Sequence, residues 1–410
     1  MHPNAEFTCT HAEFSSALKN AEFGINPKLP NPAQRGVIVE TRDGQAVYST
    51  FDLDTAVRVT VPCPTAQAAG TSLLDFTELS KTLAAMVAGE PKATAAATSV
   101  ALRGDLLVGP DMTVPISALD TTAYVSAPAP VAAMVVLDGQ ALRRQLDRVL
   151  PTTGTDDTLP VLAGVQFTID AETCTLAATD RYRFAVADLP SRTAPGAPQT
   201  AAFDLNIPGS FLRRLAKPLK DHTGPVGIGV SEDRLWVTLT LGSLTFTTRL
   251  IDGRLPRHGK LFPTTAAASL QIDRVALVTA TKKCTAVLKA KGADSLTPIS
   301  FRWNRDGTLT LAPALPEAHD RARLSGIPLP YETVGGDATT LHASSQSLKP
   351  AYLTAALDAF AGDTLTLHLP DTENGQGLRK PVLLTDGPDL QGDGYRHLLM
   401  PITLDFSWAL

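Results

Sequence analysis

The order of the expected helices and strands repeats three times along the 410-residue chain. Apolar residues at helical spacing and runs of alternating residues predict helix, strands, helix, strands in each repeat, with a period of roughly 130 residues. That period is too long for a solenoid and fits three copies of one domain. We therefore expect an α+β fold in which two helices of each copy pack on one face of an antiparallel sheet. The copies are placed at residues 1–130, 131–266 and 267–410.

The expected helices come in pairs, one pair to each copy. They are 14–21 and 73–87, 139–149 and 210–220, and 272–288 and 348–360. Pro218 should end or bend its helix, because proline lacks the N–H that a helix interior needs. The expected strands are 36–40, 46–52, 55–61, 99–102, 106–108, 226–230, 235–240, 244–250, 298–303, 308–312, 364–369, 380–384 and 397–404.

The stretch 159–190 is the densest segment of the second copy. It predicts a strand around Leu162–Phe167, a polar turn at Asp170–Glu172, and a second strand that opens at Leu176 and runs on to Val186. Cationic and aromatic residues alternate in the middle of that second strand, from Arg181 to Phe184. Asp180 beside them is expected to be part of a structural turn rather than a reactive site.

Composition excludes several classes of protein. A net charge of −5 argues against a chain that binds nucleic acid over its whole surface, so any such contact needs a local group of cations. The four cysteines form no CxxC pair, which argues against a zinc site or a disulfide framework. The N-terminus does not have the pattern of a signal peptide, and no run of about 18 apolar residues occurs. We expect a cytoplasmic protein without metal or cofactor.

Basic residues concentrate on the predicted helices of the second and third copies. Solvated helix faces would explain any one of them, but their recurrence on equivalent helices of two copies favours nucleic acid as the partner. The candidates for facing DNA are Arg143, Arg144, Arg148, Arg213, Arg214, Lys217, Lys220, Lys282, Lys283 and Lys289.

Six segments, in order and at family spacing, resemble the bacterial sliding clamp, the beta subunit of DNA polymerase III. LPVLAGVQF and AATDRYRFAV in the second copy resemble R-P-V-L-x-G and V-A-T-D-G-H-R-L-A, and FTTRLIDGRLPRHGKLFP resembles F-x-S-R-L-I-x-G-x-[FY]-P. In the third copy, residues 348–353 resemble F-N-x-x-Y-L, 380–384 resemble K-P-V-L-[IL], and 398–404 resemble the terminal M-P-[MV]-[RKT]-L motif. The resemblance covers essentially the whole chain.

The resemblance implies a ring of two chains joined head to tail, with helices lining a central hole around double-stranded DNA. Such a ring is a topological tether that confers processivity on a DNA polymerase and needs no catalytic site. Loose contacts between basic helices and phosphates would give weak, salt-sensitive and sequence-independent affinity. An ATP-driven clamp loader would have to open the ring.

The resemblance also implies a pocket for short hydrophobic peptides of polymerase subunits and the clamp loader, between the second and third copies. An apolar slot with a cationic rim suits leucine and phenylalanine anchors, and roughly micromolar binding would follow. Without the resemblance, residues 398–402 would be interpreted as a plain core strand. The pocket residues carried over are Leu162, Thr179, Arg181, Tyr182, Arg183, Phe184, Pro256, Lys260, Leu261, Leu398, Leu399, Met400, Pro401 and Ile402.

The chain departs from the family pattern at this pocket. Arg181, Tyr182 and Phe184 replace the family's glycine, histidine and leucine, and Lys349 replaces an asparagine. The chain also continues beyond Leu404 with a tail that carries Phe406, Trp408 and Leu410, which could fold back into the pocket or be disordered. We therefore expect a divergent or accessory clamp whose pocket binds peptides, or a pocket-binding inhibitor, differently.

Two other classes of protein are less well supported by the sequence. An enzyme is disfavoured because residues 253–260, GRLPRHGK, have five residues between the glycines and no Ser or Thr after the lysine, unlike a phosphate-binding P-loop. The histidines show no metal-binding spacing, and no GxSxG motif occurs. A divergent paralogue that acts in inhibitor resistance, or a protein-binding scaffold that does not encircle DNA, remains the alternative.

Overall fold

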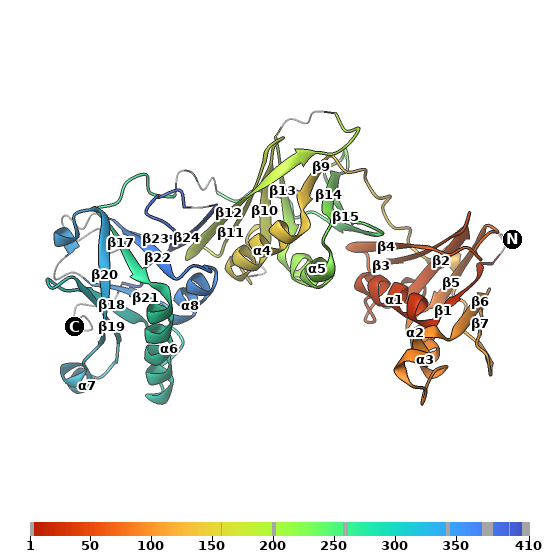
Figure 1. Ribbon diagram of the computed structural model, residues 1–410, viewed down its shortest axis with the longest axis horizontal. Helices are drawn as coiled ribbons and strands as arrows, with labels where there is room; N and C mark the ends of the chain where they lie inside the picture. The colour runs from red at the N-terminus through yellow and green to blue at the C-terminus, as the bar shows by residue number, and fades with distance from the viewer. Residues whose placement is uncertain are drawn as a thin grey trace. The chain divides into compact units, whose positions relative to one another are not determined.

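The computed structural model describes residues 4–156, 158–198, 202–256, 259, 261–341, 345–370, 380–392 and 394–403. Helices and antiparallel strands follow one another along the described part of the chain (Figure 1). The elements of the first part are β1 Glu6–Thr10, α1 His11–Ala21, β2 Gly36–Arg42, β3 Gln45–Phe51, β4 Thr55–Pro62, β5 Gly70–Asp75, α2 Phe76–Ala85, α3 Lys92–Ala97, β6 Ser99–Arg103, β7 Leu106–Val108 and β8 Thr113–Pro115.

In the residues that the structure describes, the middle and last parts repeat this order without a counterpart of α3, and the last part adds one short helix between its third and fourth strands. The middle part holds β9 Val135–Asp138, α4 Gly139–Val149, β10 Gly164–Ile169, β11 Thr173–Thr179, β12 Arg183–Thr193, β13 Phe203–Pro208, α5 Gly209–Asp221, β14 Pro225–Val230, β15 Trp236–Leu241 and β16 Leu244–Arg249. The last part holds β17 Ala268–Asp273, α6 Arg274–Ala290, β18 Ile299–Trp303, β19 Thr308–Pro313, α7 Ala318–Arg323, β20 Ile327–Gly336, β21 Ser345–Leu348, α8 Pro350–Asp358, β22 Thr364–Leu369, β23 Val382–Thr385 and β24 Tyr395–Leu399.

The pairing of the strands repeats in the three copies, as the order of the elements does. β2 pairs with β3 and β5, as β10 pairs with β11 and β13, and β18 with β19 and β21. β1 pairs with β6, β9 with β14, and β17 with β22. The α+β class and the threefold repeat expected from the sequence are therefore confirmed.

The chain folds into two compact units, each assembled from several segments. The first contains Met1–Gln140, Ser191–Ala201 and Phe211–Leu250, and the second contains Ala141–Pro190, Ala202–Ser210 and Ile251–Leu410. This division passes through the second expected copy, so the expected boundaries at 130 and 266 stay a prediction.

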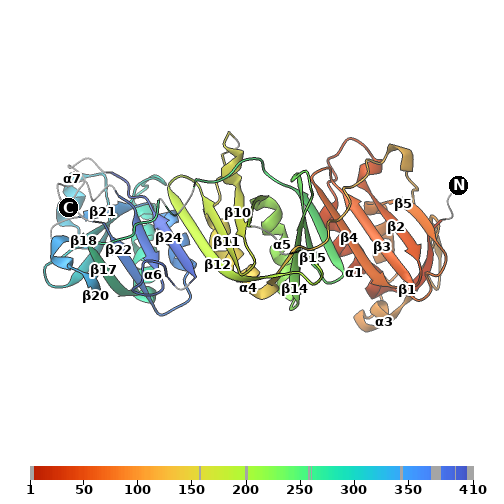
Figure 2. The same ribbon diagram turned by 90° about the horizontal axis from the view of Figure 1, so that it is seen from above.

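One long antiparallel sheet runs through each unit. In the first unit the strand order is β12–β9–β14–β15–β16–β4–β3–β2–β5, in which only Ser191–Thr193 of β12 take part. In the second unit the order is β13–β10–β11–β12–β24–β23–β22–β17–β20. Figure 2 shows β12 beside β24 in the second unit, and β2, β3 and β4 side by side in the first. Successive copies are thus joined by strand pairing, β16 to β4 and β24 to β12.

The helices bury apolar faces that the sequence predicts. Leu142, Leu146 and Val149 of α4 are fully buried, and α1 buries Phe14 against Phe7 and Tyr48. Burying each such side chain stabilises the fold by ~1.5–3 kcal/mol. In the second unit α6 packs alongside α8 (Figure 1).

Three helices begin later than expected, because a strand leads into each of them with almost no loop. Residues 73–75 belong to β5, and Asp75 caps α2 by accepting a hydrogen bond from the Glu78 N–H. Asp273 ends β17 and caps α6 in the same way. Residue 348 likewise ends β21, before α8 starts at Pro350. In α2 and α6, an acidic N-cap stops the strand ladder and starts the helix within one residue.

Two expected element ends are wrong. Pro218 does not end α5, since the helix continues to Asp221. Its last turn is held by buried Leu219 and by the Gln140 side chain, which donates hydrogen bonds to the carbonyls of Leu219 and His222. The C-terminal strand expected over 397–404 ends at Leu399, and residue 404 lies outside the described residues.

All four cysteines are free thiols. Within the described ranges, no helix combines the length and the apolar composition needed to cross a membrane.

Candidate binding sites

A tight turn joins β11 to β12 in the second unit, so the single strand expected through Val186 is wrong. One Asp180 carboxylate oxygen accepts hydrogen bonds from the N–H groups of Tyr182 and Arg183, both at 3.1 Å. Its other oxygen accepts one from Arg183 Nε at 2.9 Å. The Thr179 hydroxyl donates to the Arg183 carbonyl at 2.7 Å and accepts from the Arg181 N–H at 3.1 Å. The structural role expected for Asp180 is thereby explained.

Arg181 occupies the strained position of this turn. Its φ of +80° lies in the left-handed region, which favours glycine because a Cβ is disfavoured there. The family motif has glycine at this position, and here a cation stands in its place. The guanidinium reaches Asp156 at 3.7 Å, and both side chains are largely exposed. The substitution therefore places a charge at the turn at the cost of backbone strain.

Next to the turn, two tyrosines and two cations form a stack. The ring of Tyr182 lies 6.2 Å from that of Tyr352 on α8, nearly parallel at 26°. The Arg183 guanidinium lies 4.4 Å from the Tyr352 ring centre, and Lys349 Nζ lies 4.5 Å from it. Cations over an aromatic face are attracted by its quadrupole. Tyr182 nevertheless remains 54% exposed and available for contact.

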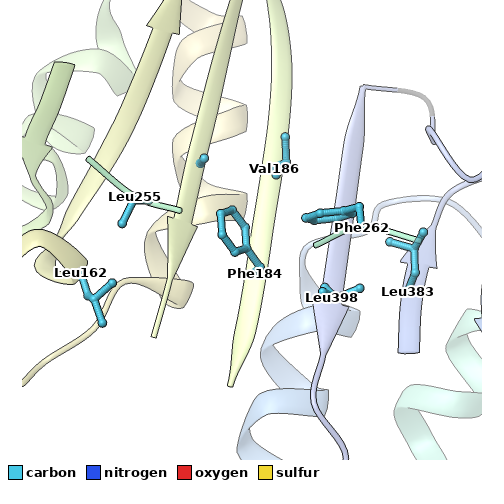
Figure 3. Close-up of a cluster of buried hydrophobic side chains, with 8 residues drawn as sticks. Leu162, Phe184, Val186, Leu255, Phe262, Leu383 and Leu398 are labelled. Carbon is cyan, nitrogen blue, oxygen red and sulfur yellow. The ribbon is translucent and has the colours of Figure 1, made fainter. Parts of the chain in front are cut away.

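Behind the turn lies an apolar cluster that brings distant segments together (Figure 3). Phe184 meets Phe262 edge to face, with ring centres 5.8 Å apart. Leu162 from the 3-10 turn at Pro160–Ala163 and Leu398 from β24 belong to the same cluster. The remaining members are Ala177, Val186, Leu255 and Leu383, and Leu159, Val161 and Leu390 pack against it partly buried.

Beyond β24 the chain passes from buried to accessible side chains. Leu398 and Leu399 are buried, whereas Met400 is 39% exposed and Pro401 and Ile402 are half-buried. The Met400 N–H donates to the Tyr182 carbonyl at 2.8 Å, which fixes this segment beside the turn. Leu261 is 47% exposed and Pro256 is exposed. The predicted pocket residues thus divide into a buried apolar floor and an exposed rim.

Most of the predicted pocket residues therefore lie within one unit, with Leu162, Phe184 and Leu398 in one cluster. Lys260 and the tail residues Phe406, Trp408 and Leu410 lie outside the described residues. The sequence prediction missed Leu255, Phe262, Leu383 and Tyr352. All four fall inside the quoted motifs 246–263, 348–353 and 380–384, which could have identified them.

The basic residues of α4 differ in how they are held. Arg144 is exposed, whereas Arg143 forms an ion pair with Asp147 at 3.8 Å. The Arg148 guanidinium lies 5.0 Å from the centre of the buried Tyr395 ring and donates to Gln145. Arg148 is thus partly engaged in packing.

The basic residues of α5 border a surface cleft in the first unit. Arg213, Arg214 and Lys217 line this cleft of about 980 Å³ together with Lys19 of α1. Arg214 is anchored, because its guanidinium lies 4.1 Å from the Phe23 ring centre and 3.9 Å from an Asp52 oxygen. Arg213, Lys217 and Lys220 are exposed. The lysines Lys282, Lys283 and Lys289 of α6 are exposed as well, in the second unit.

Comparison with known proteins adds independent findings. Residues 136–257 match the family described as DNA polymerase III beta subunit, central domain. A beta sliding clamp from Streptomyces coelicolor is 27% identical over 397 residues, which cover 95% of this chain and 97% of the relative. A beta sliding clamp homolog, GriR, from Streptomyces muensis is 27% identical over 67% of this chain and 70% of its own length.

Solved structures share the fold. The Pseudomonas aeruginosa DnaN sliding clamp bound to griselimycin superposes with a TM-score of 0.78 at 18% identity, over 98% of this chain and 100% of that chain. The sliding clamp of Bacillus subtilis superposes with a TM-score of 0.79 at 16% identity, over 99% of this chain and 100% of that chain.

Proposed function

The chain belongs to the bacterial beta sliding clamp family, and we propose that it encircles double-stranded DNA and confers processivity on a DNA polymerase. Two copies would join head to tail into a closed ring that tethers its partners without holding any one DNA sequence. The tether acts by topology and uses no catalytic group, so opening the ring falls to a separate clamp loader. The protein would act in the bacterial cytoplasm.

The observation that carries this proposal is a strand pairing between neighbouring copies, here called a joint, which occurs twice inside the chain. The last strand of the middle copy, β16, pairs with β4, and the last strand of the final copy, β24, pairs with β12. In the order of elements β8 is equivalent to β16 and β24, and β20 is equivalent to β4 and β12. We therefore expect β8 to pair with the start of β20. Within the described part of the chain, β8 pairs only with β7, and Ile327–Pro330 of β20 pair only with β19. A second copy supplies the missing partner at both ends, and a repeated joint of this kind closes a ring.

The basic helices support the DNA part of the proposal. Exposed cations on α4, α5 and α6 attract phosphates without contacting base edges. Such contacts release counterions, and they weaken as salt rises. Local groups of cations on these helices would let a chain of net charge −5 contact DNA.

The apolar cluster and its exposed rim support the partner part of the proposal. Tyr182, Leu261 and Met400 offer apolar and aromatic area around a buried floor, with Lys349 and Arg183 beside them. Leucine and phenylalanine anchors of a short peptide fit this chemistry. The same surface is proposed to receive peptides of polymerase subunits and of the clamp loader.

The deciding experiment measures topological retention. The protein is loaded by a clamp loader on nicked circular DNA, and its retention is compared before and after linearisation. A clamp stays on the circle, leaves the linear ends within minutes, and shows about twice the chain mass in solution. Equal retention on circles and linear DNA would contradict encirclement and would favour a scaffold without replicative role.

A further inference from the structure

The joint between β16 and β4 has two hydrogen bonds that mark its ends. The Thr60 N–H donates to the Ser243 carbonyl at 3.0 Å, and the Arg249 N–H donates to the Asp54 carbonyl at 3.0 Å. Between them, the paired strands keep one register. In an antiparallel ladder, alternate residue pairs exchange both bonds, so donors are needed at every second position of each strand.

The joint between β24 and β12 has the same frame. The Asp188 N–H donates to the Gly394 carbonyl at 2.8 Å, and the Met400 N–H donates to the Tyr182 carbonyl at 2.8 Å. The register between the two strands is again unbroken. Two joints of one design therefore define what the third, between β8 and the start of β20 of a second copy, would require.

A proline common to the three copies fixes the equivalence on one side of the third joint. Pro62, Pro190 and Pro330 each face the first residue of the preceding strand, Gln45, Thr173 and Thr308. Two residues before these prolines stand Thr60, Asp188 and Pro328. The first two donate the bond that ends each internal joint, whereas Pro328 has no N–H to donate.

The strand pairings fix the equivalence on the other side. Thr10, Asp138 and Asp273 are equivalent, because each directly precedes the first helix of its copy. Following the strand registers from these residues to the last strand of each copy makes Pro115 equivalent to Thr247 and Leu398. Those two residues lie in the middle of the internal joints, opposite Ala56 and Phe184. Pro115 therefore removes a central donor from the third joint.

Two more donors of the third joint are already engaged within the chain. The Ser117 N–H, which is equivalent to those of Arg249 and Met400, donates to a Glu78 carboxylate oxygen at 2.9 Å. The Leu324 N–H, which is equivalent to those of Ala56 and Phe184, donates to the Arg321 carbonyl at 3.2 Å, where the short helix α7 ends. The pair of Thr113 with Gly326 can still exchange backbone hydrogen bonds, as residue pairs of an ordinary antiparallel ladder do.

We infer that the joint between two copies is the weak joint of the ring, because prolines and local bonds remove backbone donors that both internal joints use. The inference rests on the proposed ring and names its partner, a second copy of this chain. Closure then depends on side chains and on a short ladder around Thr113 and Gly326. The dimer should dissociate on dilution while the joints inside each chain stay intact.

The test restores donors by the double substitution Pro115→Ala and Pro328→Ala in the full-length chain. One net backbone hydrogen bond corresponds to about a two- to tenfold change in Kd. The dimer Kd, measured by sedimentation velocity over a dilution series, should fall about tenfold or more. Residence on circular DNA should lengthen in parallel.

Pro330→Ala is the matched control, because its counterparts Pro62 and Pro190 are also prolines in joints that form normally. This variant should leave the dimer Kd within about twofold of the parent. Glu78→Ala tests the same joint without changing a proline. It frees the Ser117 N–H and should therefore tighten the dimer about two- to fivefold. Far-UV circular dichroism verifies that each variant is folded.

The outcomes separate the inference from the proposed function. A parent dimer that neither the proline pair nor Glu78→Ala tightens overturns the inference and leaves the ring standing. A parent and variants that all stay monomeric at every concentration, without retention on circular DNA, overturn the proposed ring itself and the inference with it.

Discussion

At the scale of single residues, the turn between β11 and β12 shows how a motif can be recognisable while its chemistry has changed. Asp180 and Thr179 keep the turn by binding the N–H groups and carbonyl that follow them. Arg181 takes a left-handed position that glycine would occupy without strain. The sequence indicated the motif and its departures, but only the backbone conformation reveals that Arg181 is strained.

Arg181→Gly should therefore raise the free energy of unfolding by about 0.5–1 kcal/mol, since relief of the left-handed strain outweighs the flexibility that glycine adds to the unfolded chain. Arg181→Ala removes the same guanidinium but keeps the Cβ, so it should give no gain. Urea denaturation of the two variants and the parent provides the comparison. Equal stability of the glycine and alanine variants would show that this turn stores no strain.

Met400 and Leu399 are neighbours with opposite expected effects. Met400 is 39% exposed on the rim, so Met400→Ala should leave stability nearly unchanged and weaken a Leu- and Phe-containing peptide about tenfold. Leu399 is 1% exposed, so Leu399→Ala should cost about 2–5 kcal/mol of stability. Fluorescence anisotropy with a labelled peptide measures the first effect, and urea denaturation the second. An unchanged peptide affinity for Met400→Ala would remove this rim from the proposed site.

At the scale of elements, the sequence predicts helices best where an amphipathic pattern is isolated, as in α4, which spans the expected residues 139–149. It fails where a strand passes directly into a helix, because the apolar residues of β5, β17 and β21 extend the helical pattern backwards. The floor of the candidate site was only partly foreseeable. Leu255 and Phe262 lie far from Leu383 in the sequence and meet it in one cluster only in the folded chain, which local patterns do not report.

Two buried histidines on β22 and β24 make the second unit sensitive to acid. Burial lowers the pKa of His368 to about 4, and burial with the nearby Arg183 charge lowers that of His397 to about 3. In the unfolded chain these histidines bind protons near pH 6.5, whereas in the folded chain they do not. The free energy of unfolding therefore has its full value above pH 6.5 and falls as the pH drops towards 4. Each histidine should cost about 2 kcal/mol of stability between pH 7 and pH 5.

The measurement is urea denaturation at pH 7, 6 and 5. His368→Gln, which can still bond to Ser269 and Thr385, should reduce the loss over this range by about 2 kcal/mol. His319→Gln is the matched control for replacing a histidine by glutamine, because the His319 side chain is mostly exposed. A parent protein equally stable at pH 7 and pH 5 would contradict the prediction.

At the scale of the whole molecule, the proposed ring predicts a salt dependence that can be assigned to named lysines. Lys282→Ala with Lys283→Ala on α6 should shorten residence on circular DNA and reduce the magnitude of its slope against log salt by about 1–2. Lys291→Ala at the end of the same helix is the control, because Lys291 is paired with Asp320 at 2.8 Å. Identical slopes for all three proteins would place the DNA contact elsewhere.

The way the segments interleave also constrains how the protein can be made. The chain passes between its two units five times, at residues 140, 190, 201, 210 and 250. During synthesis the first unit cannot complete its sheet until β16 has left the ribosome, although most of its strands emerge far earlier. The second unit stays open until β24, almost at the end of translation. A nascent chain arrested before residue 244 should therefore expose the edge of β4 to other chains, a period in which chaperones would matter most.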